Sequence, residues 1–412
     1  MVAPILHQGV STAGRRAGRS RPALRSGSPV ALRRRNGQLF YLAGTNHRRQ
    51  RRWDCRLDGS MSRGGSVSFG EVPLSSLVAP PAERFPTYPA SWYLFGRASE
   101  LRRGPVSRDL LGRRLVAFRT TTGQLSVLDG RCAHLGTDLG AGRVRGEALQ
   151  CPFHQWCYGT DGRCVHIPAT SVIPDFARLE VYPAVERHGF VFFFNGRQPL
   201  FSLPFFPGVD PDDFVPADPF DAVLRCPYWM IGANAFDVQH FRSAHDRKLL
   251  DSPVVECPAP YARRITATFA VLGDSLRDSL VRRLAGDRVV MSFTDWCGNI
   301  IFATPTFRRT TSYGMLINEP VGRDRVHVHV LVFVRRHRGL LGRCLVDPLR
   351  ARVRRYFIKE FLQSDARLAA KGLRYNPAGL RDGDEELIRY FDWLARCYEP
   401  RPLGSGDGST AP

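Results

Sequence analysis

Residues 132–154 begin with Cys132-Ala133-His134 and end with Cys151-Pro152-Phe153-His154, and sixteen residues separate the two groups. Each group pairs one thiol with one imidazole. Two thiolates and two neutral imidazoles are the ligand set of a 2Fe–2S cluster in which histidines replace the cysteines on one iron. A structural zinc site is the alternative, because zinc also accepts two cysteines and two histidines. Zinc sites of that type usually place like ligands in each pair, so the mixed pairs favour the iron–sulfur cluster.

A second set of candidate ligands follows downstream. Asn234, Asp237, His240 and His245 lie within twelve residues, and Asp365 lies far along the chain. Two histidines and a carboxylate form the facial triad that holds a mononuclear ferrous iron and leaves positions open for dioxygen. His240 and His245 are five residues apart, so we expect a bend or an irregular turn between them to bring both imidazoles to one metal. The three-residue spacing of Asn234, Asp237 and His240 predicts a helix near Trp229–His245.

Length and composition describe a globular chain. Its 412 residues are enough for two or three domains. The contents of 43% apolar and 24% charged residues are ordinary for a globular protein. No run of about 18 apolar residues occurs, so no membrane span is expected. The ten cysteines lack paired spacing, which argues against a secreted disulfide framework and favours a cytoplasmic location.

The positive charge is concentrated at the N-terminus. Residues 1–60 hold thirteen arginines and two aspartates, so they carry more than half of the net charge of +21. The rest of the chain has only a modest positive excess, and nucleic acid is therefore not an expected partner. Residues 1–85 are rich in Arg, Gly, Ser and Pro and are predicted to be a disordered or mis-started basic extension, with an organelle transit peptide as the alternative. A second basic cluster, between Arg335 and Lys359, is either a solvated helix face or a docking surface for an acidic electron donor.

Residues 86–200 predict an all-β domain, because short apolar segments alternate with turn dipeptides such as Asp129-Gly130 and Asp161-Gly162. The expected strands are Ser91–Phe95, Arg114–Arg119, Leu125–Leu128, Leu149–Cys151, Leu179–Tyr182 and Phe190–Asn195. Both halves of the Cys/His motif then fall in loops. A linker rich in Pro and Asp follows at 201–223.

Residues 224–400 predict an α+β domain, with the helix described above, then long alternating strands, then two closing helices. The expected strands are Arg264–Val271, Val289–Phe293, Ile300–Thr304 and Val326–Val334, and the closing helices are Leu349–Lys371 and Glu385–Cys397. His327 and His329 alternate, so both project from one face of a strand, either toward a pocket or onto a polar sheet surface. Residues 401–412 are predicted to be a disordered tail.

Residues 88–198 resemble the Rieske domain of ring-hydroxylating oxygenases, and Asn234-x-x-Asp237-x-x-His240-x4-His245 resembles the signature of their catalytic domain. Respiratory-chain Rieske proteins carry two further cysteines, at positions that are Thr137 and Phe153 here, which points to the oxygenase or ferredoxin branch. The resemblance spans about residues 85–400. It implies an α+β chain: an N-terminal all-β Rieske domain, then an antiparallel-sheet-plus-helices catalytic domain of the START-like, helix-grip type.

The resemblance also implies residue roles. Cys132, His134, Cys151 and His154 would hold the 2Fe–2S cluster, and His240, His245 and Asp365 would hold mononuclear Fe(II). Glu360 and Asp382 are competing carboxylates for the last position. Asp237 is implied to hydrogen-bond a cluster histidine of the neighbouring subunit, which makes a homotrimer the expected assembly. Asn234 either hydrogen-bonds near the iron or caps its helix.

The implied function is that of a terminal oxygenase component. A separate NAD(P)H-dependent reductase or ferredoxin would supply electrons, and dioxygen would hydroxylate, desaturate or demethylate a hydrophobic ring substrate. The stretches Pro89–Tyr93, Asn376–Asp384 and Phe391–Trp393 are similar to the 3-ketosteroid 9α-hydroxylase and cholesterol 7-desaturase group, which suggests a steroid substrate. The alternative is a Rieske ferredoxin-type electron carrier with a non-catalytic appended domain.

Overall fold

The computed structural model describes residues 78–399. The predictions for residues 1–77 and for the tail at 401–412 lie outside these residues. Phe85 is buried, and its ring stacks on that of Trp229 with the centroids 4.8 Å apart. The packed chain therefore includes Phe85, the last residue of the predicted basic extension.

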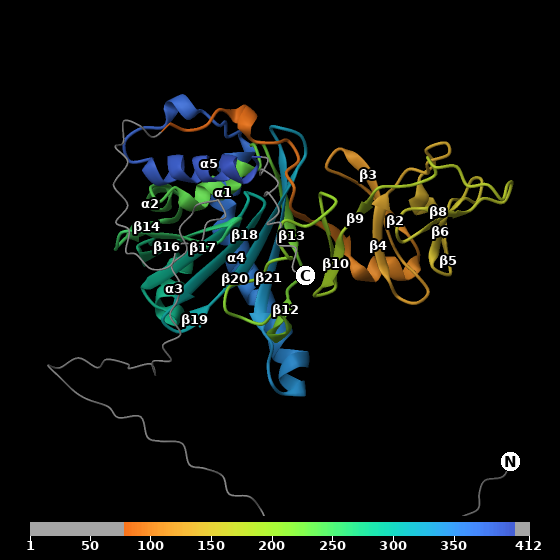
Figure 1. The fold of residues 1–412 in the computed structure, drawn as a ribbon. Coiled ribbons are helices and arrows are strands. Elements are labelled where there is room, and N and C mark those ends of the chain that lie inside the picture. The colour runs from red at the N-terminus through yellow and green to blue at the C-terminus, as the bar shows by residue number, and fades with distance from the viewer. Residues whose placement is uncertain (1–77, 400–412) are drawn as a thin grey trace, which may run out of the picture. The chain divides into compact units, whose positions relative to one another are not determined.

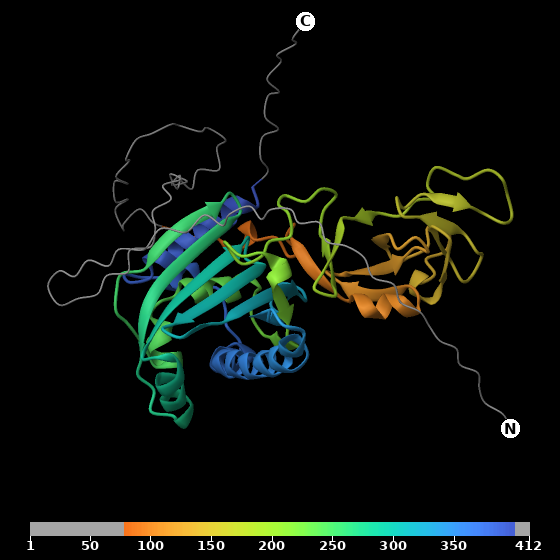
Figure 2. The ribbon, with the colours of Figure 1, turned by 90° about the horizontal axis from the view of Figure 1, so that it is seen from below.

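The first part of the described chain is all-β and is coloured orange to yellow-green in Figure 2. Its antiparallel strands form one three-stranded sheet, β1-β11-β10, and two four-stranded sheets, β2-β3-β4-β9 and β5-β6-β7-β8. The strands are β1 (Trp92–Arg97), β2 (Val106–Leu110), β3 (Arg113–Arg119), β4 (Leu125–Asp129), β5 (Arg143–Arg145), β6 (Ala148–Gln150), β7 (Cys157–Gly159), β8 (Cys164–His166), β9 (Val181–Tyr182), β10 (Ala184–Arg187) and β11 (Phe190–Phe194).

Strand β11 shows why this part folds as it does. All five of its residues are apolar and buried. Phe190, Phe192 and Phe194 pack into one core cluster, while Val191 and Phe193 pack into another. A continuous apolar run is what a strand covered on both faces requires.

The second part contains one ten-stranded sheet, ordered β12-β21-β20-β18-β17-β16-β14, in which β13 also pairs with β21, β15 with β16 and β19 with β18 (Figure 1). Its strands are β12 (Phe214–Pro216), β13 (Phe220–Leu224), β14 (Arg247–Leu249), β15 (Val254–Ala259), β16 (Ala262–Val271), β17 (Arg288–Trp296), β18 (Ile300–Phe307), β19 (Thr310–Thr311), β20 (Tyr313–Pro320) and β21 (Val326–Arg335). Buried and half-buried residues alternate along β16, as the period of a strand with one covered face requires.

Within residues 78–399, five α-helices accompany this sheet: α1 (Trp229–Phe236), α2 (His240–His245), α3 (Leu276–Ala285), α4 (Asp347–Ala370) and α5 (Glu385–Cys397). Short 3-10 helices lie at Ala82–Arg84, Ala98–Arg103, Leu139–Ala141, Pro211–Asp213 and Pro377–Gly379, and a π-helical turn at Gly342–Val346 precedes α4. Helices α1 and α5 lie side by side in Figure 1 and share a core with the valines of β21. That core contains Trp229 and Ala233 from α1 and Phe391 and Leu394 from α5.

The opposite face of the sheet packs against β1 and β11. Trp92 and Phe194 share a core cluster with Phe302, Ile317 and Phe333 of the large sheet. The side-chain amide of Asn299 donates a hydrogen bond to the carbonyl oxygen of Trp92 at 2.6 Å. The sheet of the second part is therefore covered by helices on one face and by strands of the first part on the other.

The predicted α+β class, with an all-β part followed by an antiparallel sheet and helices, is confirmed. Helix α5 has the predicted bounds, and the predicted strands agree with the observed ones to within three residues at each end. Helix α3 was not predicted, although its leucines at 276, 280 and 284 recur every four residues; in the structure all three are exposed. No helix within residues 78–399 is long and apolar enough to cross a membrane.

Candidate metal centres

The first candidate centre is formed by two loops, one after β4 and one between β6 and β7. Cys132 and Cys151 are buried, whereas His134 and His154 are exposed. The amide of Cys151 donates to the carbonyl oxygen of Trp156 at 2.8 Å, which closes the second loop tightly. The loops therefore hold the two sulfurs inside and the two imidazoles at the surface, as a cluster with an inner and an outer iron requires.

The two histidines of this centre face each other. The ring centroids of His134 and His154 are 4.6 Å apart, and the indole of Trp156 stacks on His134 at the same centroid distance with an angle of 2° between the planes. The stacking fixes the orientation of one imidazole. Four ligands from two loops thus converge, and the residues present fit a Rieske-type cluster.

Tyr158 supports the buried side of this centre. Its hydroxyl lies 3.1 Å from the Cys132 sulfur and also accepts a hydrogen bond from the amide of Ala133 at 3.1 Å. Burial raises the pKa of Tyr158 above its ordinary value, so the phenol stays protonated and can donate to a thiolate. Hydrogen bonds to cluster sulfurs tune the reduction potential. The role of Tyr158 was not predicted from the sequence, because its contact with Cys132 joins positions 26 residues apart.

The second candidate centre is assembled from α2 and α4. One ligand atom each from His240, His245 and Asp365 lies within 4.8 Å of the others. His240 is the first residue of α2 and His245 is the last, and their ring centroids are 5.3 Å apart. The prediction of a bend between the two histidines is therefore wrong: one short helix spans both, and the chain instead breaks at Asp237–Gln239, between α1 and α2.

His240 is preorganised as a ligand. Its Nδ1 donates to the carbonyl oxygen of Asp237, so Nε2 carries the lone pair. Nε2 is buried and has no hydrogen-bond partner among the described residues. Burial also lowers the pKa of His240 below its ordinary value, which favours the neutral ring that a metal needs. A buried nitrogen without a partner is costly unless a cation binds it.

His245 is oriented by residues of α4. The Ser364 hydroxyl donates to the carbonyl oxygen of Phe361 at 3.1 Å, so its Oγ accepts from Nδ1 of His245 at 3.2 Å. Nε2 of His245 then faces Asp365, with its two carboxylate oxygens at 3.0 and 3.2 Å. The phenyl ring of Phe361 stacks on the imidazole at 4.0 Å and 9°. This geometry fits a mononuclear metal held by two Nε2 atoms and a carboxylate.

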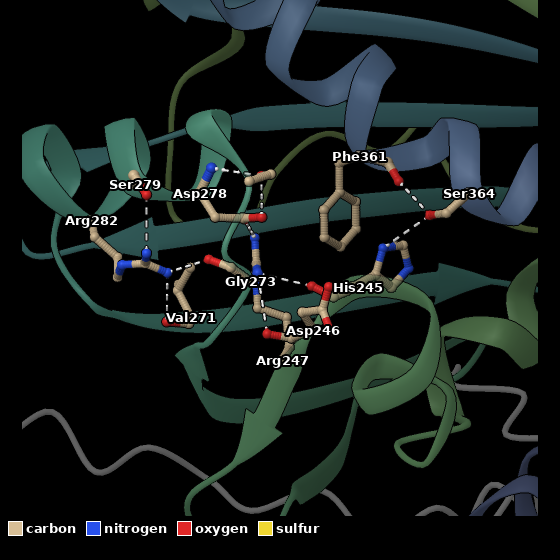
Figure 3. A network of polar contacts seen from close by, with 11 residues as sticks. His245, Asp246, Arg247, Val271, Gly273, Asp278, Ser279, Arg282, Phe361 and Ser364 are labelled. Carbon is tan, nitrogen blue, oxygen red and sulfur yellow. Dashed lines mark hydrogen bonds and ion pairs between the residues drawn. The ribbon is translucent and has the colours of Figure 1, made fainter.

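A buried ion pair supports the turn that follows His245 (Figure 3). Arg247 pairs with Asp278 at 3.0 Å and donates to the carbonyl oxygen of His245 at 2.8 Å. The side chains of Arg247 and Asp278 are only 9% and 7% exposed. Asp246 adopts a left-handed backbone conformation (φ 52°) where α2 ends, and Arg247 also donates to its carbonyl oxygen at 3.3 Å. The pair therefore fixes the end of α2 and with it the position of His245.

The other predicted residues lie between α1 and α2. The Asp237 Oδ1 atom accepts from the amides of Gln239 and His240 at 3.1 and 3.3 Å, so this carboxylate also stabilises the start of α2. Asn234 lies inside α1, whose N-terminal cap is Tyr228, so Asn234 does not cap that helix. The competing carboxylate of Asp382 is exposed and lies outside the group formed by His240, His245 and Asp365.

The comparison with known protein families decides the nature of the first centre. A family model described as the Rieske 2Fe-2S domain matches residues 91–182, which include all four candidate cluster ligands. The chain carries a Rieske domain. The structural zinc alternative for Cys132, His134, Cys151 and His154 is thereby set aside.

Several curated relatives are similar to a part of this chain. Aminopyrrolnitrin oxygenase of Pseudomonas fluorescens is 38% identical over 170 residues, which are 38% of this chain and 46% of that protein. Cholesterol 7-desaturase of Xenopus laevis is 33% identical over 171 residues, 40% of this chain and 38% of the relative. The oxygenase component of 3-ketosteroid-9-alpha-monooxygenase of Rhodococcus rhodochrous is 33% identical over 138 residues, 33% of this chain and 34% of the relative. The matched segments thus span less than half of each relative.

Solved structures match over a larger part of the chain. Dicamba monooxygenase bound to dicamba has a TM-score of 0.56 at 18% identity, over 75% of this chain and 97% of that one. The NdmA QL mutant of Pseudomonas putida CBB5 with caffeine has a TM-score of 0.55 at 21% identity, over 76% of this chain and 90% of that one. The fold is therefore that of the Rieske oxygenases, and the predicted resemblance is confirmed.

Proposed function

We propose that this chain is a terminal oxygenase component, which takes electrons from a separate reductase or ferredoxin and uses dioxygen to oxidise a hydrophobic ring substrate. The observation that carries the proposal is the convergence of His240, His245 and Asp365 in the same chain as a Rieske domain. An electron carrier has no use for a second ligand set of this kind, which argues against the ferredoxin-type alternative.

When bound, a Rieske cluster supplies single electrons, and a mononuclear ferrous iron supplies the activation of dioxygen. The residues of the chain hold and tune these groups. Trp156 and Tyr158 orient the cluster ligands, as described above. Ser364 holds the ring of His245 with its Nε2 aimed at Asp365. The carbonyl oxygen of Asp237 holds the ring of His240 with its Nε2 aimed into the buried site. The protein thus supplies positions and ligand tautomers rather than the oxygen chemistry itself.

The surroundings of the second centre support an apolar substrate. Phe241 and Phe269 belong to a core cluster beside His245, and half-buried Phe293, Phe307 and Phe361 pack against that cluster. Apolar and aromatic side chains beside a metal site are suited to contact with a ring compound. Among ring compounds, the similarity to relatives named for cholesterol and for 3-ketosteroids favours a steroid that is hydroxylated or desaturated.

The proposal includes an assembly and a domain division. Asp237 uses Oδ1 within its own chain, and we expect Oδ2 to reach a cluster histidine of a neighbouring subunit in a homotrimer, which joins the two metal centres for electron transfer. Asn234, half-buried on α1, is expected to hydrogen-bond near the iron. The Rieske domain would occupy residues 86–200, a linker 201–223 and the catalytic domain 224–400, with β12 and β13 of the linker joining the sheet of the catalytic domain through β21. The cysteine spacing in the sequence favours a cytoplasmic location.

The test is the content of iron and acid-labile sulfide per chain in anaerobically purified protein. We expect about three irons and two sulfides, which a cluster and one mononuclear iron require. Asp365→Ala should lower the iron to about two, with the sulfide and the cluster spectrum unchanged. Asp382→Ala is the matched control, because its carboxylate is exposed and near in sequence, and it should keep all three irons. Two irons in every protein, despite added ferrous iron, would leave the electron carrier as the better interpretation.

A further inference from the structure

A second cluster of histidines and carboxylates lies on the face of the large sheet opposite the helices. Glu319 is on β20, His327 and His329 are on β21, and Asp221 is on β13. Glu319 is the direct register partner of His327, and Asp221 is that of His329. Val326, Val328 and Val330 point to the helix-covered core, so the alternating histidines point the other way.

The ligand atoms of this cluster are close together. One atom each from Glu319, His327 and His329 lies within 4.8 Å of the others, and the two imidazole centroids are 4.1 Å apart. Glu319 Oε2 is 2.9 Å from His329 Nε2 and 3.8 Å from His327 Nδ1. Around a tetrahedral zinc ion, with bonds of about 2.0–2.2 Å, neighbouring ligand atoms lie roughly 3.3–3.5 Å apart. The observed separations bracket this value.

Asp221 selects the ring nitrogen of His327 that faces the cluster. Its Oδ2 lies 2.9 Å from His327 Nε2, so Nε2 carries the proton and donates to the carboxylate. Nδ1 of the neutral ring then presents its lone pair toward the Glu319 carboxylate. These two electron-rich atoms repel each other, whereas a cation bound between them would be attracted to both. A carboxylate that orients a metal-binding imidazole through its other nitrogen is a common arrangement around metals.

Burial and access also suit a bound ion. The side chains of Glu319 and His329 are 10% and 17% exposed, and that of His327 is 28% exposed. The ligands are therefore partly shielded from water, which strengthens their attraction for a cation, while one side stays open for an ion to enter. Because the three ligands come from two adjacent strands, a bound ion would cross-link β20 and β21.

We propose that Glu319, His327 and His329 form a second metal site, which binds a divalent transition-metal ion of the zinc type, with Asp221 as a positioning residue. Two imidazoles and one carboxylate suit zinc and its neighbours in the transition series rather than magnesium or calcium, which prefer oxygen ligands. The site does not depend on the oxygenase function proposed above, since it shares no ligand with the centre at His240, His245 and Asp365.

The test is zinc binding to the intact iron-loaded protein. The protein is incubated with excess zinc and desalted, and zinc and iron are then both counted per chain. We expect about one zinc per chain in the wild type and none in the His327→Ala/His329→Ala variant, with iron unchanged in both. Glu319→Gln, which keeps the side-chain volume, should also lose the zinc. Asp221→Asn should weaken binding about 10- to 100-fold, as loss of an orienting carboxylate does at other sites.

Two controls distinguish this site from other sources of bound zinc. His166→Ala removes an exposed histidine of β8 and should leave the zinc content unchanged. His240→Ala removes a ligand of the other centre and should lower iron but keep the zinc. Equal zinc in the wild type and in the His327→Ala/His329→Ala variant would overturn the proposal, and so would zinc gained only as iron is lost. The cluster would then be two histidine–carboxylate hydrogen bonds and nothing more.

Discussion

The two metal centres of this chain are built over very different distances in the sequence. The four cluster ligands lie between residues 132 and 154, in loops held by neighbouring strands. The mononuclear centre joins α2 to α4, and the contact between His245 and Asp365 spans 120 residues. The first centre therefore depends mainly on local turns, whereas the second depends on the packing of a whole domain. Substitutions at one centre should therefore remove its metal and leave the metal of the other centre in place.

The largest expected effect is at the local centre. Cys151→Ser removes a buried thiolate of the cluster site, so we expect the loss of the whole cluster, of its visible absorption and of both sulfides. His245→Ala should instead remove only the mononuclear iron. Iron and sulfide analysis of the two variants side by side checks this prediction. Loss of the cluster in His245→Ala would show that the two centres are not independent.

The next largest effect is expected at the buried ion pair that supports α2. Arg247→Met removes the cation of a buried ion pair, which costs about 3–5 kcal/mol of unfolding free energy. Glu256→Gln removes half of a more exposed pair with Arg264 and should cost no more than ~1 kcal/mol. Urea denaturation measures both. Similar values for the two variants would argue against a structural role of the pair beneath His245.

A smaller effect is expected from the serine that orients His245. Ser364→Ala removes the acceptor for Nδ1 but leaves all three ligands in place, so affinity for ferrous iron should fall about 10- to 100-fold. Ser243→Ala is a suitable control, because the Ser243 hydroxyl lies on α2 but donates to the carbonyl oxygen of His240. Equilibrium dialysis against ferrous iron gives the two dissociation constants, and equal constants would mean that Ser364 does not position the ring.

The smallest effect is expected within the cluster loops. Tyr158→Phe removes one hydrogen bond to the Cys132 sulfur, worth about 1 kcal/mol, which corresponds to a reduction potential lower by ~40 mV for one electron. Tyr182→Phe removes a hydroxyl of the same domain that contacts Arg113 and Glu180 and should leave the potential unchanged. Redox titration of the cluster distinguishes them, and a potential unaltered in Tyr158→Phe would contradict the assigned hydrogen bond.

The same difference in sequence distance explains what could be predicted from the sequence. The cluster ligands followed from the mixed Cys/His pairs, and β11 followed from its apolar run, because both are local patterns. The residues around His245 could not be found from local patterns. Asp365 was chosen only by the family resemblance, and the contacts of Ser364 and Arg247 were not predicted. Their roles depend on how α4 and β14 pack beside α2, and periodicity does not encode that. The course of the chain between His240 and His245 was mispredicted for the same reason.

Electron paramagnetic resonance of the reduced protein with nitric oxide tests the central proposal most directly. Nitric oxide binds a ferrous iron that has an open coordination position and gives a signal distinct from that of a reduced Rieske cluster. We predict both signals in the wild type, and the loss of the nitric oxide signal alone in His240→Ala, whose lone-pair nitrogen points into the site. A wild-type protein that is fully loaded with iron and shows only the cluster signal would contradict an oxygenase with an open mononuclear iron.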